Sequence, residues 1–142
     1  FKLDLKQTDY YFELEKAEEN VEFMEVEGNF ISVKPAKNIL KDKKIINIEE
    51  NSFINDAIMM KNLKSKYILL KEKNTNNVLL KFNFEEFPVL AIWTIPNLDF
   101  VCIEPWFTYG DTTADNGNFK DKPGMITLKE NQEFKCNYSV EF

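Results

Sequence analysis

The sequence contains no histidine and no arginine, and its 142 residues include only four glycines and two cysteines. Without histidine, a His-based catalytic triad, a His metal site and an internal imidazole general acid are excluded within this chain. Two separated cysteines are too few for a structural zinc site, and no glycine-rich phosphate loop or dinucleotide fingerprint is present. We therefore expect neither a metal nor another cofactor.

The chain also has little positive charge relative to its acids, with a formal net charge of −6. Nucleic acids and anionic membrane surfaces normally bind basic patches, so we expect neither as a partner. No apolar stretch reaches the length of a membrane span, and no signal peptide is evident. Cys102 and Cys136 both lie in strand-like patterns, which predicts buried thiols of a cytoplasmic protein rather than a disulfide.

Hydrophobic residues make up 44% of the chain, and this share includes aromatic residues, which are 14% of the chain. This is enough apolar material for the core of one domain over residues 1–142. The dominant period is two, which indicates strands. In the final segment 133–142, Phe134, Cys136, Tyr138, Val140 and Phe142 alternate with polar residues and are expected to form the buried face of a strand. The fold class is therefore all-β, either an antiparallel β-sandwich or an open barrel-like pair of sheets.

Turn signals divide the rest of the chain. Residues 64–84 predict a hairpin, because two apolar segments flank the turn residues Asn74-Thr75-Asn76. Residues 88–95 predict a central strand, because they are apolar on both faces. Residues 108–124 hold three of the four glycines and predict a long loop, which in compact domains is usually functional or disordered. Helical periodicity is weak along the chain, and residues 36–45 predict at most one turn of helix.

Glu104 is the strongest candidate for chemistry, in the segment Val101-Cys102-Ile103-Glu104-Pro105-Trp106. An acid at the end of an apolar strand, beside Trp106, is partly desolvated and so becomes a usable base near neutral pH. The alternative is that strand alternation turns its side chain outward into water.

Carboxylates, aromatic rings, Asn and Lys are the side chains left for a site, and this set suits a sugar, with its apolar faces and polar rim. Asp56 follows Asn55 among apolar neighbours, and its alternative is a turn residue, since Asn-Asp pairs favour turns. Trp93 is either core or part of a binding surface. Trp106 and Phe107, at the start of the long loop, are better placed to stack on a ligand.

Three segments resemble the aldose 1-epimerases, or galactose mutarotase-like proteins, and especially their LacX-like branch. The most specific is FPVLAIWTIPNLDFVCIEPWFTYGD, with its Ile-Glu-Pro-Trp; the others are FINDAIMMKNLKSKYILL and KPGMITLKENQEFKCNYSVEF. The resemblance covers essentially this whole chain, but only about the C-terminal half of the family's protein. It implies a galactose mutarotase-like supersandwich of antiparallel strands, of which residues 1–142 form the C-terminal part.

The resemblance also implies a hexose as ligand and a mechanism. In that family a glutamate removes the anomeric proton while a histidine protonates the ring oxygen; the ring then opens and recloses as the other anomer. Glu104 matches the glutamate, and Asp56 matches an aspartate that hydrogen-bonds sugar hydroxyls, while Trp93 and Trp106 shape the pocket. The histidine, absent here, is expected a few residues upstream of Phe1. The chain alone is then expected to be inactive, and its exposed sheet edges to be covered by the missing N-terminal half or another chain.

Two other interpretations remain open. A non-catalytic carbohydrate-binding β-sandwich would use the same groove without chemistry, and the lack of histidine favours it if the chain is complete. A relative of the hexose-phosphate epimerases is the third, although the lack of arginine counts against phosphate binding in this part.

Overall fold

The computed structural model describes all of residues 1–142 as eleven β-strands and two short 3₁₀ helices joined by loops. The strands form a five-stranded sheet in the order β11-β8-β7-β1-β5, a four-stranded sheet in the order β10-β9-β6-β2, and a two-stranded ribbon of β3 and β4. All pairs between these strands are antiparallel. The expectation of an all-β antiparallel sandwich is confirmed.

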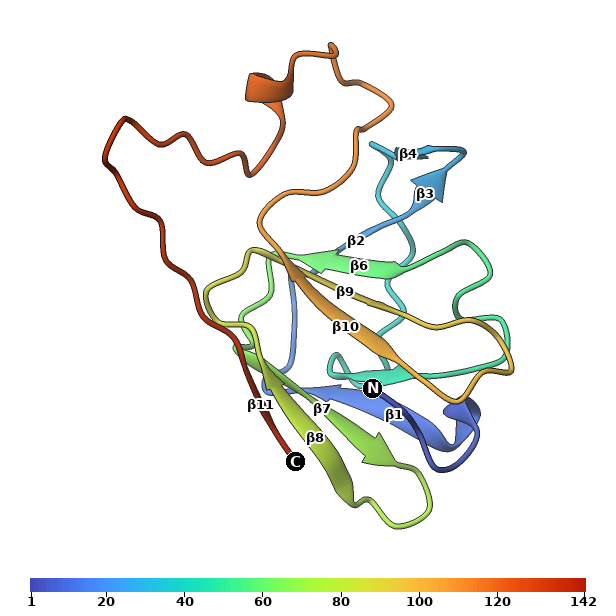
Figure 1. The fold of residues 1–142 in the computed structure, drawn as a ribbon. Helices are drawn as coiled ribbons and strands as arrows, with labels where there is room; N and C mark the ends of the chain where they lie inside the picture. Colours follow the sequence, from blue (N-terminus) through green and yellow to red (C-terminus); the bar gives the residue numbers. More distant parts are fainter.

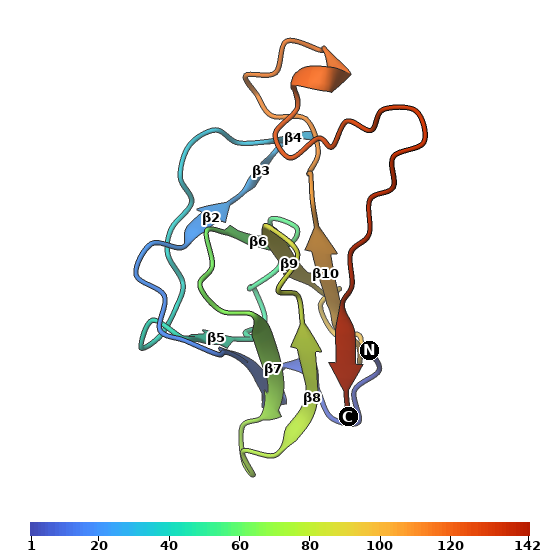
Figure 2. The same cartoon turned by 90° about the vertical axis from the view of Figure 1, so that its left-hand side faces the viewer.

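In chain order the elements are η1 (Gln7–Asp9), β1 (Tyr10–Leu14), β2 (Glu22–Met24), β3 (Val26–Glu27), β4 (Phe30–Ile31), β5 (Ile45–Asn47), β6 (Ile58–Lys61), β7 (Tyr67–Glu72), β8 (Val78–Asn83), β9 (Val89–Trp93), β10 (Cys102–Trp106), η2 (Phe119–Asp121) and β11 (Ser139–Glu141). Figure 1 shows the five-stranded sheet below the four-stranded sheet, and β3 and β4 above both of them. Figure 2 shows the segment after β10 arching beyond the sheets before it returns beside β8 as β11. No helix has the length and apolar character needed to cross a lipid bilayer.

The main core lies between the two larger sheets. Phe12, Ile68 and Leu70 from the five-stranded sheet and Leu90 and Ile92 from the four-stranded sheet are fully buried members of one apolar cluster. Residues that alternate in a strand point to opposite faces, so these side chains fix which face of each sheet is turned inward. Strand β9 is internal and buried along most of its length, as the apolar run 88–95 predicts.

The hairpin predicted over residues 64–84 is present as β7 and β8. Asn76 has φ +59°, a conformation that asparagine tolerates better than most residues, and its amide donates to the Glu72 carbonyl at 2.9 Å. The turn chemistry of Asn74-Thr75-Asn76 therefore sets the position of the hairpin. Residues 36–45 do not form a helical turn; instead Lys41 bridges Ile45, where β5 begins.

The C-terminal segment differs from its predicted strand. Only Ser139–Glu141 pair with β8, and Phe134, Tyr138 and Phe142 are 45%, 61% and 91% exposed. Cys136 is exposed as well, so the expectation of a buried thiol is wrong there. The strand β11 is the outer strand of its sheet, and the exposed aromatic residues all lie outside its three paired residues.

Glu18 is the one fully buried carboxylate, although its acidic surroundings in the sequence predict a solvated strand face. Its oxygens accept hydrogen bonds from the amides of Lys64 and Ser65 and from the Ser65 hydroxyl, the last at 2.6 Å. These donors compensate the lost hydration of the charge. Glu18 thus fastens the loop after β1 to the loop after β6 and is not available to a ligand.

Candidate functional site

The four-stranded sheet has a second face, turned away from the main core, which we call the outer face. Strand register places Glu104 opposite Ala91 and Cys102 opposite Trp93. Directly opposed residues of antiparallel strands point to the same side, and alternation separates all four from Ile92, which points into the core. Glu104, Trp93 and Cys102 therefore share the outer face.

An apolar floor lies under this face. The register continues from Ala91 to Met59 and from Met59 to Met24, so one row crosses the whole sheet from Glu104. Met24, Met59 and Ala91 form a buried cluster with Val89 and Ile31, separate from the main core. The carboxylate of Glu104 therefore stands at the edge of a water-poor surface on a rigid sheet.

Trp93 fixes the orientation of Glu104. The indole Nε1 donates a hydrogen bond to Glu104 Oε1 at 2.6 Å, and both side chains are half-buried. A hydrogen bond to a charged acceptor is stronger than one between neutral groups, so it holds the carboxylate in place. Glu104 Oε2 accepts no hydrogen bond from the chain. The carboxylate is neither fully solvated nor deeply buried.

Cys102 lies two residues before Glu104 on the same face and is a half-buried free thiol. Burial raises the pKa of Cys102, and the negative charge of Glu104 raises it further. The thiol therefore stays protonated near neutral pH and does not act as a nucleophile, because the thiolate is the reactive form.

The two tryptophans occupy different places on the outer face. Trp106 is half-buried, two residues after Glu104, and packs against the apolar floor. Trp93 packs partly against the main core and meets Phe100 edge-on, with ring centroids 5.8 Å apart. Trp93 is thus partly a core residue, which is one of the two roles that the sequence leaves open, and its N–H is used by Glu104.

Asp56 lies in the turn before β6 and is exposed. Its φ is +84°, and its Oδ1 accepts a hydrogen bond from the Ala57 amide at 2.7 Å. Both features are typical of a turn residue, but a non-glycine residue at positive φ is also a strained conformation of the kind found at binding sites. Ile58, two residues later, pairs with Ile92, so Asp56 lies at the end of the sheet where Trp93 is found.

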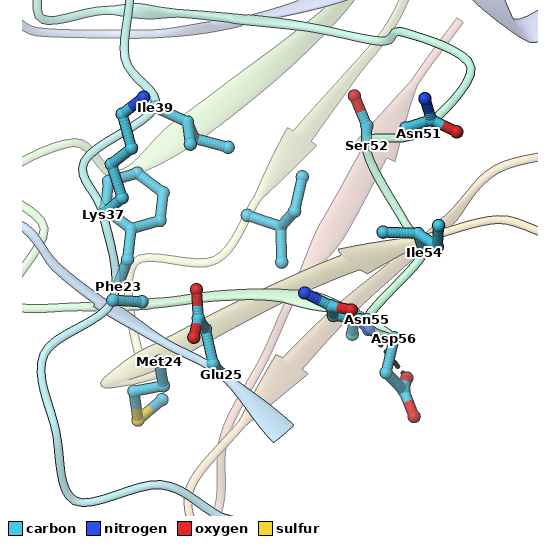
Figure 3. A pocket seen from close by; sticks show the side chains of 13 residues that line it. Phe23, Met24, Glu25, Lys37, Ile39, Asn51, Ser52, Ile54, Asn55 and Asp56 are labelled. Atoms are coloured by element: carbon cyan, nitrogen blue, oxygen red, sulfur yellow. Dashed lines mark hydrogen bonds between the residues drawn. The ribbon is translucent and has the colours of Figure 1, made fainter. Parts of the chain in front are cut away.

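Two hollows adjoin the β2–β6 side of the sheet, and Glu104 lines neither of them. A cavity of about 130 Å³ lies between the segments that precede β6 and follow β2, and Asp56 forms part of its wall. In Figure 3 Lys37 and Asp56 lie on opposite sides of the view, and the Asp56 carboxylate points away from Glu25 and Lys37. A larger hollow of about 490 Å³ is bounded by β2, β4, β6 and the loop after β10.

The structure brings Glu104, Trp93 and Trp106 onto one face, with Asp56 at its edge. Sequence reasoning missed Cys102 as a neighbour of Glu104 and missed the floor formed by Met24 and Met59. The position of Cys102 could have been found from the sequence, because Cys102, Glu104 and Trp106 alternate along one strand. The floor could not be found this way, because it depends on which distant strands pair.

The fold is that of a galactose mutarotase-like sandwich. A galactose mutarotase related enzyme from Lactobacillus acidophilus superposes with a TM-score of 0.78 over 96% of this chain and 46% of that chain, at 20% sequence identity. No family model matches the sequence.

In sequence, the chain is similar to LacX proteins. The plasmid and chromosomal LacX proteins of Lactococcus lactis subsp. lactis are each 26% identical over 102 residues, which are 71% of this chain and 34% of LacX. The chain thus spans about a third of the length of these relatives. These similarities confirm the resemblance to LacX-like and galactose mutarotase-like proteins that the sequence indicates.

Proposed function

We propose that the chain carries the base-bearing part of an aldose 1-epimerase-like protein that binds a hexose and interconverts its anomers. The observation that supports this most is the hydrogen bond from Trp93 to Glu104 on the outer face of a rigid sheet. It leaves one carboxylate oxygen without a hydrogen-bond partner in the chain, on the same face as a buried apolar cluster. A general base needs this combination of fixed direction and available lone pair.

In the proposed reaction Glu104 Oε2 takes the proton of the anomeric hydroxyl while the ring oxygen gains a proton from an acid. The bond between the anomeric carbon and the ring oxygen breaks, which gives the open-chain aldehyde. Rotation about the adjacent carbon–carbon bond and reclosure with the proton transfers reversed give the other anomer. Proton uptake and release balance, so the reaction needs no cofactor.

The chain has no histidine, so an imidazole acid would come from residues other than these 142. We propose a histidine located before residue 1 in the full-length protein. The chain spans 34% of LacX and 46% of the mutarotase related enzyme.

Asp56, Trp93 and Trp106 are proposed to bind the sugar. The exposed Asp56 carboxylate can accept hydrogen bonds from hydroxyls, and the half-buried tryptophan rings offer apolar faces for the ring carbons. We also propose that the remainder of the full-length protein, or another chain, covers the β11 edge and exposed aromatic residues such as Phe142.

The test is anomer exchange measured by NMR on the full-length protein. Glu104→Gln is expected to slow exchange by about 10²–10⁴-fold, the usual contribution of a general base. Glu133→Gln is the matched control, because Glu133 is an exposed acid in the C-terminal segment. Equal rates for Glu104→Gln and the wild type would remove Glu104 from the mechanism.

A carbohydrate-binding protein without catalysis is the second candidate, supported by the absence of histidine from the chain. It predicts that hexoses bind and that no variant changes the spontaneous rate of anomer exchange. Binding without acceleration by the full-length wild type would select this candidate over the first.

A further inference from the structure

The loop of residues 108–124 contains a reactive pair of residues that the proposed function does not use. Asn116 is followed by Gly117, and none of the other asparagines in the chain precedes a glycine. Both residues are exposed. The side-chain amide of an asparagine can be attacked by the backbone nitrogen of the next residue, and glycine obstructs this attack least because it has no side chain. Asn116 is therefore the asparagine of this chain at which the attack meets the least steric resistance.

The backbone nitrogen of Gly117 is available for this reaction. Its N–H donates no hydrogen bond within the chain, so no contact has to break before the nitrogen reacts. Gly117 has φ +76°, and no atom lies within 4 Å of the position that a Cβ would occupy. Glycine adopts this left-handed conformation without strain. The nucleophile is thus unhindered as well as unpaired.

Two hydrogen bonds hold and polarise the side-chain amide of Asn116. The backbone N–H of Asn118 donates to Asn116 Oδ1 at 2.8 Å, and Asn116 Nδ2 donates to Asp121 Oδ2 at 2.9 Å. When Cγ is attacked, negative charge develops on Oδ1, and a backbone N–H aimed at that oxygen stabilises the charge as a donor does in an oxyanion hole. The amide of Asn116 is therefore activated at its carbonyl group by the fold of the loop.

We propose that Asn116 is a site of self-modification, at which the chain reacts with itself and with water. The Gly117 nitrogen gives up its proton to the solvent and bonds to Cγ of Asn116, while Nδ2 leaves and takes up a proton to form ammonia. The product is a five-membered cyclic imide. Water then adds to one of the two imide carbonyls, and the bond between that carbon and the nitrogen breaks.

The position of the water attack decides the product. Addition at Cγ of residue 116 gives aspartate, and addition at its backbone carbonyl gives isoaspartate, in which the chain continues through the side chain. In both cases one water is consumed and one ammonia is released, and nothing is oxidised or reduced. The reaction needs no enzyme and no cofactor.

The modification alters the contacts of the loop. Asp121 Oδ2 accepts hydrogen bonds from the side-chain amides of both Asn116 and Asn118. A carboxylate at position 116 cannot donate the first of these bonds, and it repels Asp121. It also repels Asp115, because hydrogen bonds from Thr112 hold the pKa of Asp115 below its usual range and keep that residue charged. We therefore expect the contact between residue 116 and the short helix η2 to be lost after the reaction.

The experiment keeps the full-length protein at neutral pH in water labelled with heavy oxygen and follows its peptides by mass spectrometry over several days. The peptide that contains Asn116 should gain the mass difference between an amino and a hydroxyl group, together with the heavy-oxygen label. Fragmentation should show aspartate and isoaspartate at position 116. Asn118 is the internal control, because it lies in the same exposed loop but precedes Phe119, and it should stay unmodified.

Two variants test the chemistry of the step. Gly117→Ala places a methyl group beside the nucleophile and should slow the reaction by about tenfold or more. Asn116→Gln keeps a side-chain amide but would have to close a six-membered ring, so residue 116 should stay unmodified. A synthetic peptide of residues 112–121 provides the rate without the folded loop, and the folded protein should react at least as fast as this peptide.

Three results would overturn the proposal. One is an unchanged Asn116 in the full-length protein after a time in which the peptide has reacted, since the fold would then protect the residue. The others are equal modification of Asn116 and Asn118, and an undiminished rate in Gly117→Ala.

Discussion

Strand β10 and the C-terminal residues 125–142 both carry apolar side chains, but their surroundings differ. In β10 the inward residue Ile103 joins the main core and the outward residues Glu104 and Trp106 lie over a second apolar cluster. In the C-terminal segment, Leu128 and Tyr138 are at least half exposed. Alternation therefore identifies which side chains share a face, whereas neighbouring strands and layers decide whether that face is buried.

The largest expected difference in stability comes from removing an apolar side chain of similar size from each region. Met59→Ala leaves a cavity beneath the outer face, where Met59 is 1% exposed, and should lower the free energy of unfolding by about 3 kcal/mol. Leu128→Ala, at a residue 50% exposed, should change it by less than about 0.5 kcal/mol. Urea denaturation followed by tryptophan fluorescence measures both. Equal losses would mean that the C-terminal segment is packed as tightly as the outer face.

The loop that joins the two regions provides the next test. A Cβ at Gly124 would lie 1.9 Å from the Phe107 carbonyl oxygen, and Gly124 has φ +79°. Gly124→Ala should therefore cost about 2–3 kcal/mol through steric overlap and strain.

Gly117→Ala is the matched control in the same loop. Gly117 has a similar φ of +76° but open space around the added methyl group, so only the backbone conformation is penalised, by about 1 kcal/mol. Chemical denaturation compares the two variants. A Gly117→Ala loss as large as that of Gly124→Ala would contradict the close approach at the base of the loop.

A smaller effect is expected from the hydrogen bond between Trp93 and Glu104. Trp93→Phe removes the donor and should destabilise the protein by about 1 kcal/mol more than Trp106→Phe, which removes an indole without a hydrogen bond. The difference between the two unfolding free energies isolates the bond from the loss of ring volume. No difference would show that the bond adds nothing to stability.

The smallest expected effect concerns pH. Hydrogen bonds from Lys44 and then Lys71 lower the pKa of Glu13. Since the pKa is lower in the folded state, the ion pairs stabilise the protein above the ordinary pKa of glutamate, and this contribution disappears as the pH falls through the lowered value. Glu13→Gln should reduce the loss of stability between pH 5 and 3, by less than about 1 kcal/mol. Urea midpoints across this range measure it, and identical pH profiles would contradict the prediction.

Local chemistry made much of the fold predictable. The Asn-rich turn determines the β7–β8 hairpin, and an apolar run on both faces identifies β9 as internal. The exposure of Phe134 was not predictable, because it depends on the absence of a covering layer within this chain. Glu18 was missed for a related reason: its donors, Lys64 and Ser65, are brought to it only by folding.

The candidate site was predictable in part. The position of Glu104 between an apolar run and Trp106 marks it in the sequence, and resemblance assigns roles to it and to Asp56. The bond from Trp93 could not be derived, since it requires the register of β9 against β10 across an intervening loop. Nor could the hollow, whose walls come from four separate parts of the chain.

The loop of residues 108–124 begins and ends at the same point, where Gly124 lies against Phe107. Such a loop can be exchanged for another of different length without moving the strands on either side. Because the loop supplies Tyr109 to the larger hollow but no part of Glu104 or Trp93, a change in this loop can reshape the hollow while the hydrogen bond between Trp93 and Glu104 is kept. The arrangement separates a segment whose length can change from the paired strands that hold Glu104 and Trp93 in place.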